Sequence, residues 1–175
     1  MRYVALLRGI NVGGKNMIKM EKLREIVAAL SFDNVKTYIN SGNIAFDANE
    51  ASDGKLAAKI HDAIKTEFGF EISTMVRSKR EIDEIIANNP FIGQFDDDKH
   101  LHVFFLESEP TAEQISQLLE MANENEFISV TGRTIYYMLR ISILDSALGK
   151  GFLDRKLKIV NTARNWRTTK TLAEL

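Results

Sequence analysis

A short hairpin in the first quarter of the chain is the feature that most constrains the fold. Two runs typical of β-strands, residues 35–39 and 43–46, are separated only by Asn40-Ser41-Gly42. Asn and Gly tolerate the positive φ angles of tight turns, so this spacing predicts two antiparallel strands joined directly by the turn. A sheet built of parallel βαβ units would need a long crossover between these strands and is therefore disfavoured.

The segments on either side of this hairpin alternate between strands and helices. An almost continuous apolar run at residues 3–10 is typical of a strand buried on both faces. Apolar residues at helical spacing predict helices at about 18–31 and 54–68, and residues 71–77 have the composition of a fourth strand. The order strand, helix, strand, strand, helix, strand is that of the ferredoxin-like, or split βαβ, arrangement.

The second half of the chain repeats this order. A connecting helix is expected after Ser78, a candidate N-cap with Glu81 three residues on, and is expected to end before Pro90. The elements expected after it are a strand at 100–106, a helix at 111–123, a hairpin of strands 126–130 and 133–140, an interrupted helical segment at 141–158, a strand near 157–160, and a loop and helix at 162–175. The predicted fold is therefore α+β: two ferredoxin-like (β-α-β-β-α-β type) repeats in tandem, with antiparallel sheets and helices on one face, which suggests a structural duplication.

These elements divide the chain into four parts. Residues 1–77 are predicted to form the first ferredoxin-like repeat and residues 78–98 a connecting helix and acidic loop. Residues 99–160 are predicted to form the second repeat, and residues 161–175 a basic C-terminal tail helix. A length of 175 residues allows one domain or two small ones.

The composition excludes several kinds of site. The chain has no Cys, so disulfides, thiolate nucleophiles and Cys-based zinc or iron–sulfur centres are excluded. Its three His leave little for a His-based metal centre, and we expect neither a metal nor another cofactor. No apolar run approaches the roughly 20 residues needed to cross a bilayer, and the N-terminal run lacks the features of a signal peptide. We therefore expect a cytoplasmic protein with no membrane partner.

Charge is unevenly distributed along the chain. The net charge of −1 by itself argues against a protein that binds polyanions. However, residues 1–80 carry 13 Lys and Arg against 9 Asp and Glu, residues 81–130 carry 1 against 12, and residues 131–175 carry 9 against 3. Both ends are basic, so a local site for an anionic ligand remains open. The same division would also suit association of the acidic face with the basic face of a second copy.

A glycine-rich loop follows the first strand. Residues 9–16 read Gly-Ile-Asn-Val-Gly-Gly-Lys-Asn and match the phosphate-binding pattern G-x-x-x-x-G-K, except that Asn16 replaces the Ser or Thr that holds magnesium. Such glycines let backbone N–H groups turn toward one anion, and Lys15 adds a positive charge. Three interpretations are open: a nucleotide hydrolase, which the antiparallel hairpin disfavours, a loop whose glycines serve only geometry, and a non-hydrolytic anion-binding loop. Arg8 either pairs with an acid or faces a cleft beside the loop.

Two histidines and the tail are further candidates. His100 and His102 share one face of a strand and could contact one metal ion, but two half-exposed strand residues beside a solvated acidic loop are the simpler interpretation. The tail at residues 161–170 combines three cations with the only Trp. Trp166 either stacks on a base or ring of a ligand or anchors the terminal helix to the core.

The loop, the turn and the tail resemble a known bacterial family. The segments Ala-Leu-Leu-Arg-Gly-Ile-Asn-Val-Gly-Gly-Lys-Asn at residues 5–16, Thr-Tyr-Ile-Asn-Ser-Gly-Asn at 37–43 and Arg-Asn-Trp at 164–166 are similar to motifs of the domain of unknown function family 1697. The resemblance implies an α/β protein of two ferredoxin-like repeats; it implies no activity, so no catalytic residue is carried over. Its motif positions are polar or glycine, which favours a binding surface over core packing. They are Arg8, Asn11, Gly13, Gly14, Lys15, Asn40, Ser41, Asn43, Arg164 and Asn165.

The leading hypothesis is a cytosolic binding protein for a phosphate-bearing ligand, either a nucleotide or single-stranded nucleic acid. The loop, the turn and the tail would converge on one site, with Arg8 and Lys15 supplying charge and the N–H groups of Gly13 and Gly14 supplying donors. Whether the loop and the turn share one edge of the sheet is left open. One alternative is an enzyme acting on a phosphorylated or acidic metabolite, with a histidine or an acidic side chain as its base. Another is a self-association or protein-interaction module, which includes a homo-oligomer.

Overall fold

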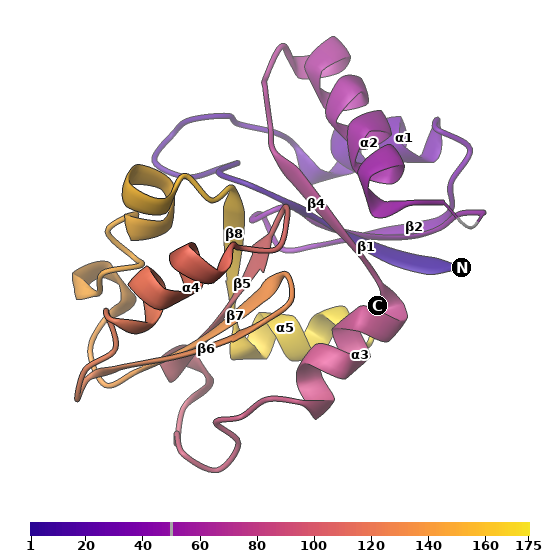
Figure 1. The fold of residues 1–175 in the computed structure, drawn as a ribbon. Helices are drawn as coiled ribbons and strands as arrows, with labels where there is room; N and C mark the ends of the chain where they lie inside the picture. Colours follow the sequence, from indigo (N-terminus) through magenta and orange to yellow (C-terminus); the bar gives the residue numbers. More distant parts are fainter. Residues whose placement is uncertain (50) are drawn as a thin grey trace. The chain divides into compact units, whose positions relative to one another are not determined.

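The computed structural model describes residues 1–49 and 51–175, and the chain divides into two compact units. The first unit contains Met1–Asp83 and Leu172–Leu175, and the second contains Glu84–Thr171. Each unit is built on one four-stranded antiparallel sheet with helices beside it (Figure 1). The predicted α+β class and the tandem arrangement of two sheet–helix units are therefore confirmed.

The first unit contains the predicted hairpin within a larger sheet. Its elements are β1 (Arg2–Leu7), α1 (Met20–Ala28), β2 (Asp33–Tyr38), β3 (Asn43–Asp47), α2 (Asp53–Phe68) and β4 (Thr74–Ser78), and α3 (Lys79–Ala87) follows. The strands lie in the order β2-β3-β1-β4, and every neighbouring pair is antiparallel. The predicted start of the connecting helix is confirmed, because the N–H of Glu81 donates to Ser78 Oγ at 3.2 Å and the N–H of Ser78 donates to Glu81 Oε2 at 2.8 Å.

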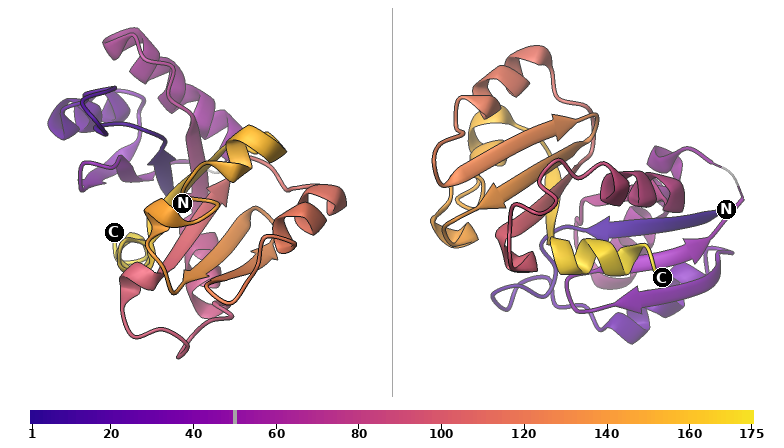
Figure 2. Two further views of the ribbon diagram at one scale, coloured as in Figure 1. Left: turned by 90° about the vertical axis from the view of Figure 1, so that its left-hand side faces the viewer. Right: turned by 90° about the horizontal axis from the view of Figure 1, so that it is seen from below.

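Both helices of the first unit cover the same face of its sheet (Figure 2). The apolar residues of α1 and α2 recur at helical spacing and pack against alternate residues of β1, because side chains along a strand alternate between its two faces. Helix α2 ends at Gly69, which adopts a left-handed φ of 74° and donates its N–H to Lys65 O. The core formed in this way includes Tyr3, Ala5, Leu7, Leu23, Val27, Leu56, Ile60 and Ile64.

The second unit contains the other four strands. Its elements are a 3₁₀ turn η1 (Asp98–His100), β5 (Leu101–Leu106), α4 (Ala112–Leu119), β6 (Glu126–Thr131), β7 (Thr134–Leu139), a second 3₁₀ turn η2 (Ile143–Asp145), a π-helical turn η3 (Leu153–Leu157), β8 (Asn161–Asn165) and α5 (Trp166–Leu172). The strand order is β6-β7-β5-β8, again antiparallel throughout. Helix α4 begins with a capping box in which Gln114 N–H donates to Thr111 Oγ1 at 3.1 Å.

The region before the C-terminus differs from the prediction. The strand expected near 157–160 lies instead at β8, and the tail helix expected over 161–175 begins only at Trp166. Lys158 has a left-handed φ of 57°, so the chain turns sharply where a strand was expected. By contrast, the interruption expected in the helical segment at 141–158 is confirmed, because η2 and η3 are separated by residues 146–152, which include Gly149 and Gly151.

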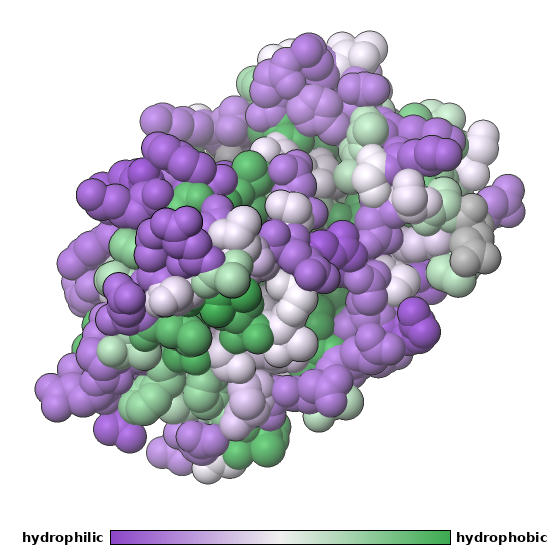
Figure 3. All heavy atoms as spheres, viewed as in Figure 1, coloured by the Kyte–Doolittle hydropathy of each residue, from purple (hydrophilic) through white to green (hydrophobic). Residues whose placement is uncertain are grey.

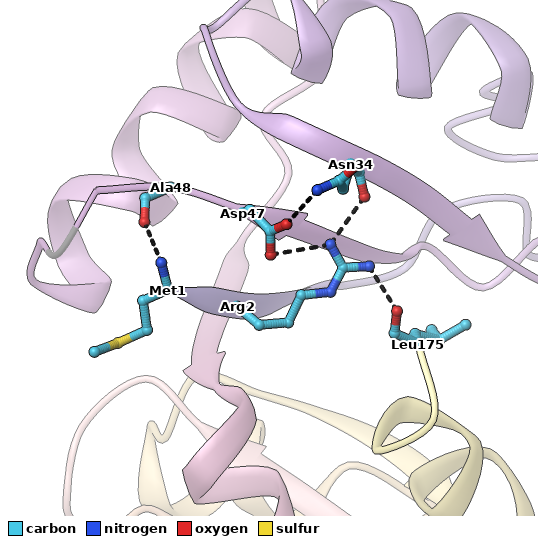
Figure 4. A network of polar contacts seen from close by, with 6 residues as sticks. All are labelled: Met1, Arg2, Asn34, Asp47, Ala48 and Leu175. Atoms are coloured by element: carbon cyan, nitrogen blue, oxygen red, sulfur yellow. Dashed lines mark hydrogen bonds and ion pairs between the residues drawn. The ribbon is translucent and has the colours of Figure 1, made fainter.

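A network of hydrogen bonds ties the last residues of the chain to the first unit (Figure 4). The guanidinium of Arg2 donates to Asn34 O at 2.9 Å, Asp47 Oδ1 at 3.2 Å and Leu175 O at 2.6 Å. Asn34 Nδ2 donates to Asp47 Oδ2 at 2.6 Å, and this bond, together with Arg2, lowers the pKa of Asp47 below its ordinary value. The network therefore joins β1, β2, β3 and the C-terminal residues within one unit.

The face of the molecule drawn in Figure 3 is mostly hydrophilic, with apolar residues reaching the surface over β6 and β7. This agrees with the burial of β6, where five of the six residues are only half-buried. Among the residues that the structure describes, no helix combines the length and apolar character needed to cross a bilayer.

Candidate functional site

The glycine-rich loop, residues 9–16, forms a small hairpin of its own. Val12 and Lys15 form an isolated antiparallel bridge, and the N–H of Lys15 donates to Val12 O at 3.0 Å. Gly13 and Gly14 lie between them with φ angles of 58° and 73°, which is the type I′ geometry that only Gly, Asn and Asp adopt readily. The glycines are therefore needed for the turn, and both are exposed at its tip.

This geometry contradicts the nucleotide hydrolase interpretation. A phosphate-binding loop of that class leads directly from a parallel strand into the N-terminus of a helix. Here both neighbours of β1 are antiparallel, and α1 begins at Met20, five residues after Lys15. The loop resembles the hydrolase pattern in sequence only.

Asn11 joins the glycine-rich loop to the turn between β2 and β3. Its Nδ2 donates to Asn40 O at 2.9 Å and to Ile18 O at 3.0 Å, and its Oδ1 accepts from the N–H of Ile18 at 2.8 Å. Both donors of the amide are used inside the protein, so the side chain of Asn11 has none left for a ligand. The role of Asn11 in this structure is to hold the loop and the turn together on one edge of the sheet.

Gly42 and Asn43 fix the other side of this contact. The N–H of Leu7 donates to Gly42 O at 2.8 Å, and a Cβ on Gly42 would lie 2.7 Å from Leu7 Cβ and 2.8 Å from Ile10 Cδ1. Asn43 is fully buried, and its Nδ2 donates to Tyr38 O at 2.9 Å and to Ser41 Oγ at 3.1 Å. The sequence left open whether the loop and the turn share one edge of the sheet. They do, because both lie side by side at the end of β1.

The surface formed by the loop and the turn combines charge with exposed apolar side chains. Lys15 is exposed and forms no ion pair with any residue in the described ranges, while Arg8 is half-buried and donates its N–H to Ser73 O at 3.0 Å. Val12, Met17 and Ile39 are 66%, 61% and 47% exposed. Ile39 also has a φ of 49°, a strained conformation for a β-branched residue.

The tail residues of the hypothesis belong to the second unit and have structural partners. Arg164 is 7% exposed, and its Nη1 donates to Thr162 Oγ1 at 2.9 Å and to Ala163 O at 2.8 Å. Burial lowers the pKa of Arg164 to about 10, which still leaves it charged at neutral pH. Trp166 is 3% exposed, so it anchors α5 to the core and is not available to stack on a ligand.

The remaining candidates, Asn165 and the two histidines, line a cavity in the second unit. Asn165 is exposed, and its Oδ1 caps α5 by accepting from the N–H of Thr168 at 2.9 Å. His100 and His102 line a cavity of the second unit together with residues that the sequence analysis did not single out, above all Arg140 and Ser142. In the described part of the chain, no group of three acidic or histidine side chains is placed to hold a metal ion.

Comparisons with known proteins agree with this fold and add no activity. A family described as "Protein of unknown function (DUF1697)" matches residues 1–136. The structure of the conserved bacterial protein SP0830 from Streptococcus pneumoniae is similar, with 27% sequence identity, a TM-score of 0.79, and coverage of 99% of this chain and 97% of that one. No curated protein matches the chain significantly.

Proposed function

The chain belongs to the family described as "Protein of unknown function (DUF1697)", and from the geometry of its first unit we propose that it binds a phosphate-bearing ligand through the glycine-rich loop and the adjacent turn. One observation carries this proposal. The side chain of Asn11 bonds to Asn40 O, so an exposed cation at the loop tip and the polar turn lie on the same edge of the sheet.

The chemistry of this edge favours an anion. Lys15 forms no ion pair within the described ranges, so its ammonium group is available to a ligand. The N–H groups of Gly13 and Gly14 take part in no backbone hydrogen bond among the described residues and provide further donors at the tip. Residues 1–80 also carry an excess of four positive charges, which would attract a phosphate.

The exposed shape of the loop favours a nucleic acid strand over a free nucleotide. A small ligand usually needs a concave pocket that encloses most of its surface. The loop tip instead places Val12 and Lys15 at the surface. Met17, just after the loop, and Ile39, next to Asn40 in the turn, are also exposed. A single strand can spread its contacts over such a surface, with phosphates on the cation and base faces on apolar side chains.

Fluorescence anisotropy with short labelled single-stranded RNA and DNA tests this function. Lys15→Ala should weaken binding about fivefold and reduce the slope of log K against log salt by about one. The matched control is Lys59→Ala, which removes an exposed Lys from α2 and should leave binding unchanged. If wild type does not bind, or if both variants bind as wild type does, the proposal is wrong.

Protein interaction at the same edge is the second candidate function. The exposed Val12, Met17 and Ile39 favour it, because exposed large apolar side chains in the loop and the turn would lose contact with water in an interface. Static light scattering separates this candidate from the first. A wild type that dimerises and a Val12→Ser/Met17→Ser variant that stays monomeric would support self-association through this edge, whereas a monomer at all concentrations would contradict self-association.

We also infer that the two units are ferredoxin-like repeats derived from one ancestor. Their strand orders, β2-β3-β1-β4 and β6-β7-β5-β8, correspond strand for strand. Arg77 pairs with Val4 in the first sheet as Arg164 pairs with Val103 in the second, and both arginines are buried. In each case Nη1 donates to the carbonyl oxygen of the preceding residue at 2.8 Å, a detail that supports duplication. A superposition of crystallographic coordinates of the two units, with these arginines in register, would test it.

A further inference from the structure

The second unit contains a cavity at the edge of its sheet where β5 begins and β7 and β8 end. Its volume is about 450 Å³, which falls in the range of small-molecule sites. Two isoleucines form an apolar wall, the other residues are polar or basic, and none is acidic. The lining residues are Lys99, His100, His102, Arg140, Ile141, Ser142, Ile143 and Asn165.

His102 is the residue that requires an explanation. Its side chain forms no hydrogen bond with any residue in the described ranges, and its Nδ1 is buried without a partner. Burial lowers the pKa of His102 to about 4, so the ring is neutral at physiological pH. The other ring nitrogen, Nε2, also has no partner among the described residues, and an unpartnered polar group at a cavity often indicates a ligand or water that completes the site.

The position of the unpartnered nitrogen indicates which tautomer the ring adopts. A neutral imidazole carries one N–H and one lone pair. A buried N–H without an acceptor is less tolerable than a buried lone pair, so the proton is placed at Nε2. Because Nδ1 is buried, Nε2 is also the nitrogen through which His102 can form a hydrogen bond with a ligand in the cavity. The ring is therefore a neutral donor.

The other polar groups of the cavity are also donors. The Oδ1 of Asn165, the residue opposite His102 in the β5–β8 register, is used by the cap of α5, which leaves its Nδ2 as a donor. The guanidinium of Arg140 lies over the Phe127 ring at 5.0 Å and donates to Glu124 O at 3.4 Å, so only part of its donor capacity is used. Lys99 adds an ammonium group that pairs with Asp97 at 3.2 Å and remains 70% exposed.

We propose that this cavity is a second ligand site, which binds a small organic anion, a carboxylate or a phosphate with a short apolar part. Arg140 and Lys99 supply the positive charge. The imidazole of His102 and the side-chain amide of Asn165 supply neutral donors, and the apolar part of the ligand contacts Ile141 and Ile143. The site lies wholly within the second unit and does not depend on the glycine-rich loop.

Nuclear magnetic resonance titration of the full chain tests the site. The probes are butyrate and inorganic phosphate, which separate a carboxylate site from a phosphate site. Either probe should shift the resonances of His102 and Asn165 in a saturable way, and long-range ¹H–¹⁵N spectra of the imidazole should show its proton at Nε2. Arg140→Gln should weaken binding about tenfold, while Arg167→Gln, an exposed cation on α5 outside the cavity, should bind as wild type does.

Several results would overturn the proposal. These are an imidazole proton at Nδ1, dissociation constants above about 10 mM for both probes, or equal binding by the two Arg variants. Lys15→Ala separates this site from the proposed function, because it should leave probe binding unchanged while weakening nucleic acid binding. Arg140→Gln should have the opposite pattern.

Discussion

Replacement of Gly42 by Ala should destabilise the first unit strongly. The added Cβ would lie 2.7 Å from Leu7 Cβ and 2.8 Å from Ile10 Cδ1, whereas carbon atoms in contact lie about 3.5–4.0 Å apart. Leu7 and Ile10 are 0% and 1% exposed, so neither can move out into solvent. Such overpacking costs about 1–3 kcal/mol, and a φ of 82° adds about 1–2 kcal/mol for a residue with a Cβ.

The matched control for this substitution is Gly14→Ala. Gly14 has a similar φ of 73°, but a Cβ there would meet nothing within 4 Å, so only the backbone cost of about 1–2 kcal/mol applies. The difference between the two variants should therefore be about 2 kcal/mol in the free energy of unfolding.

Urea denaturation followed by two signals would measure this difference. Far-ultraviolet circular dichroism reports on both units, whereas Trp166, the only Trp, lies in the second unit. A shift in the circular dichroism transition that is larger than the shift in Trp fluorescence would assign the loss to the first unit. If the two variants unfold within about 0.5 kcal/mol of each other, the steric argument is refuted.

Two further predictions concern the loop and the buried histidine. Asn11→Ala removes three hydrogen bonds, whereas the control Asn16→Ala removes only one at a similar φ angle, 48° against 53°. The Asn11→Ala variant should therefore be less stable than the Asn16→Ala variant by about 2 kcal/mol, and the amide of Ile18 should exchange its hydrogen faster. Equal stabilities of the two variants would contradict this. The pKa of His102 is about 4 in the folded chain and 6.5 as its ordinary value, so the folded state binds fewer protons than the unfolded state between pH 4 and 6.5. The free energy of unfolding should therefore fall by up to about 3 kcal/mol as the pH is lowered through this range. Urea titrations at several pH values should show a smaller pH dependence of the free energy of unfolding in His102→Gln than in wild type, and equal dependences in the two proteins would contradict the assignment.

The order of most elements could be predicted because its signals are local. The apolar periodicity of α1 and α2 and the capping pair of Ser78 and Glu81 lie within single segments. Strand β8 was not predicted at its observed position because its sequence, Asn-Thr-Ala-Arg-Asn, has one apolar residue and no alternation of apolar and polar residues. Its polar side chains are buried through contacts such as that of Arg164 with Thr162.

The candidate site was only partly predictable. The Gly13-Gly14 turn is encoded in neighbouring residues, and the sequence identified it. The contact between Asn11 and Asn40 joins residues 29 positions apart, so it depends on how the sheet assembles. The cavity beside His102 was missed for the same reason, since Arg140 reaches it from the end of β7 and no local motif marks that position.

The loops after β1 and β5 are counterparts if the two units derive from one ancestor. The first is the glycine-rich loop with Lys15, and the second is the short stretch at residues 107–110, Glu-Ser-Glu-Pro. Both sheets reach the same strand order with either loop, so this architecture does not require the glycines or the lysine. If the two units do derive from one ancestor, their loops at this position have diverged in length and charge while the strand order has stayed the same.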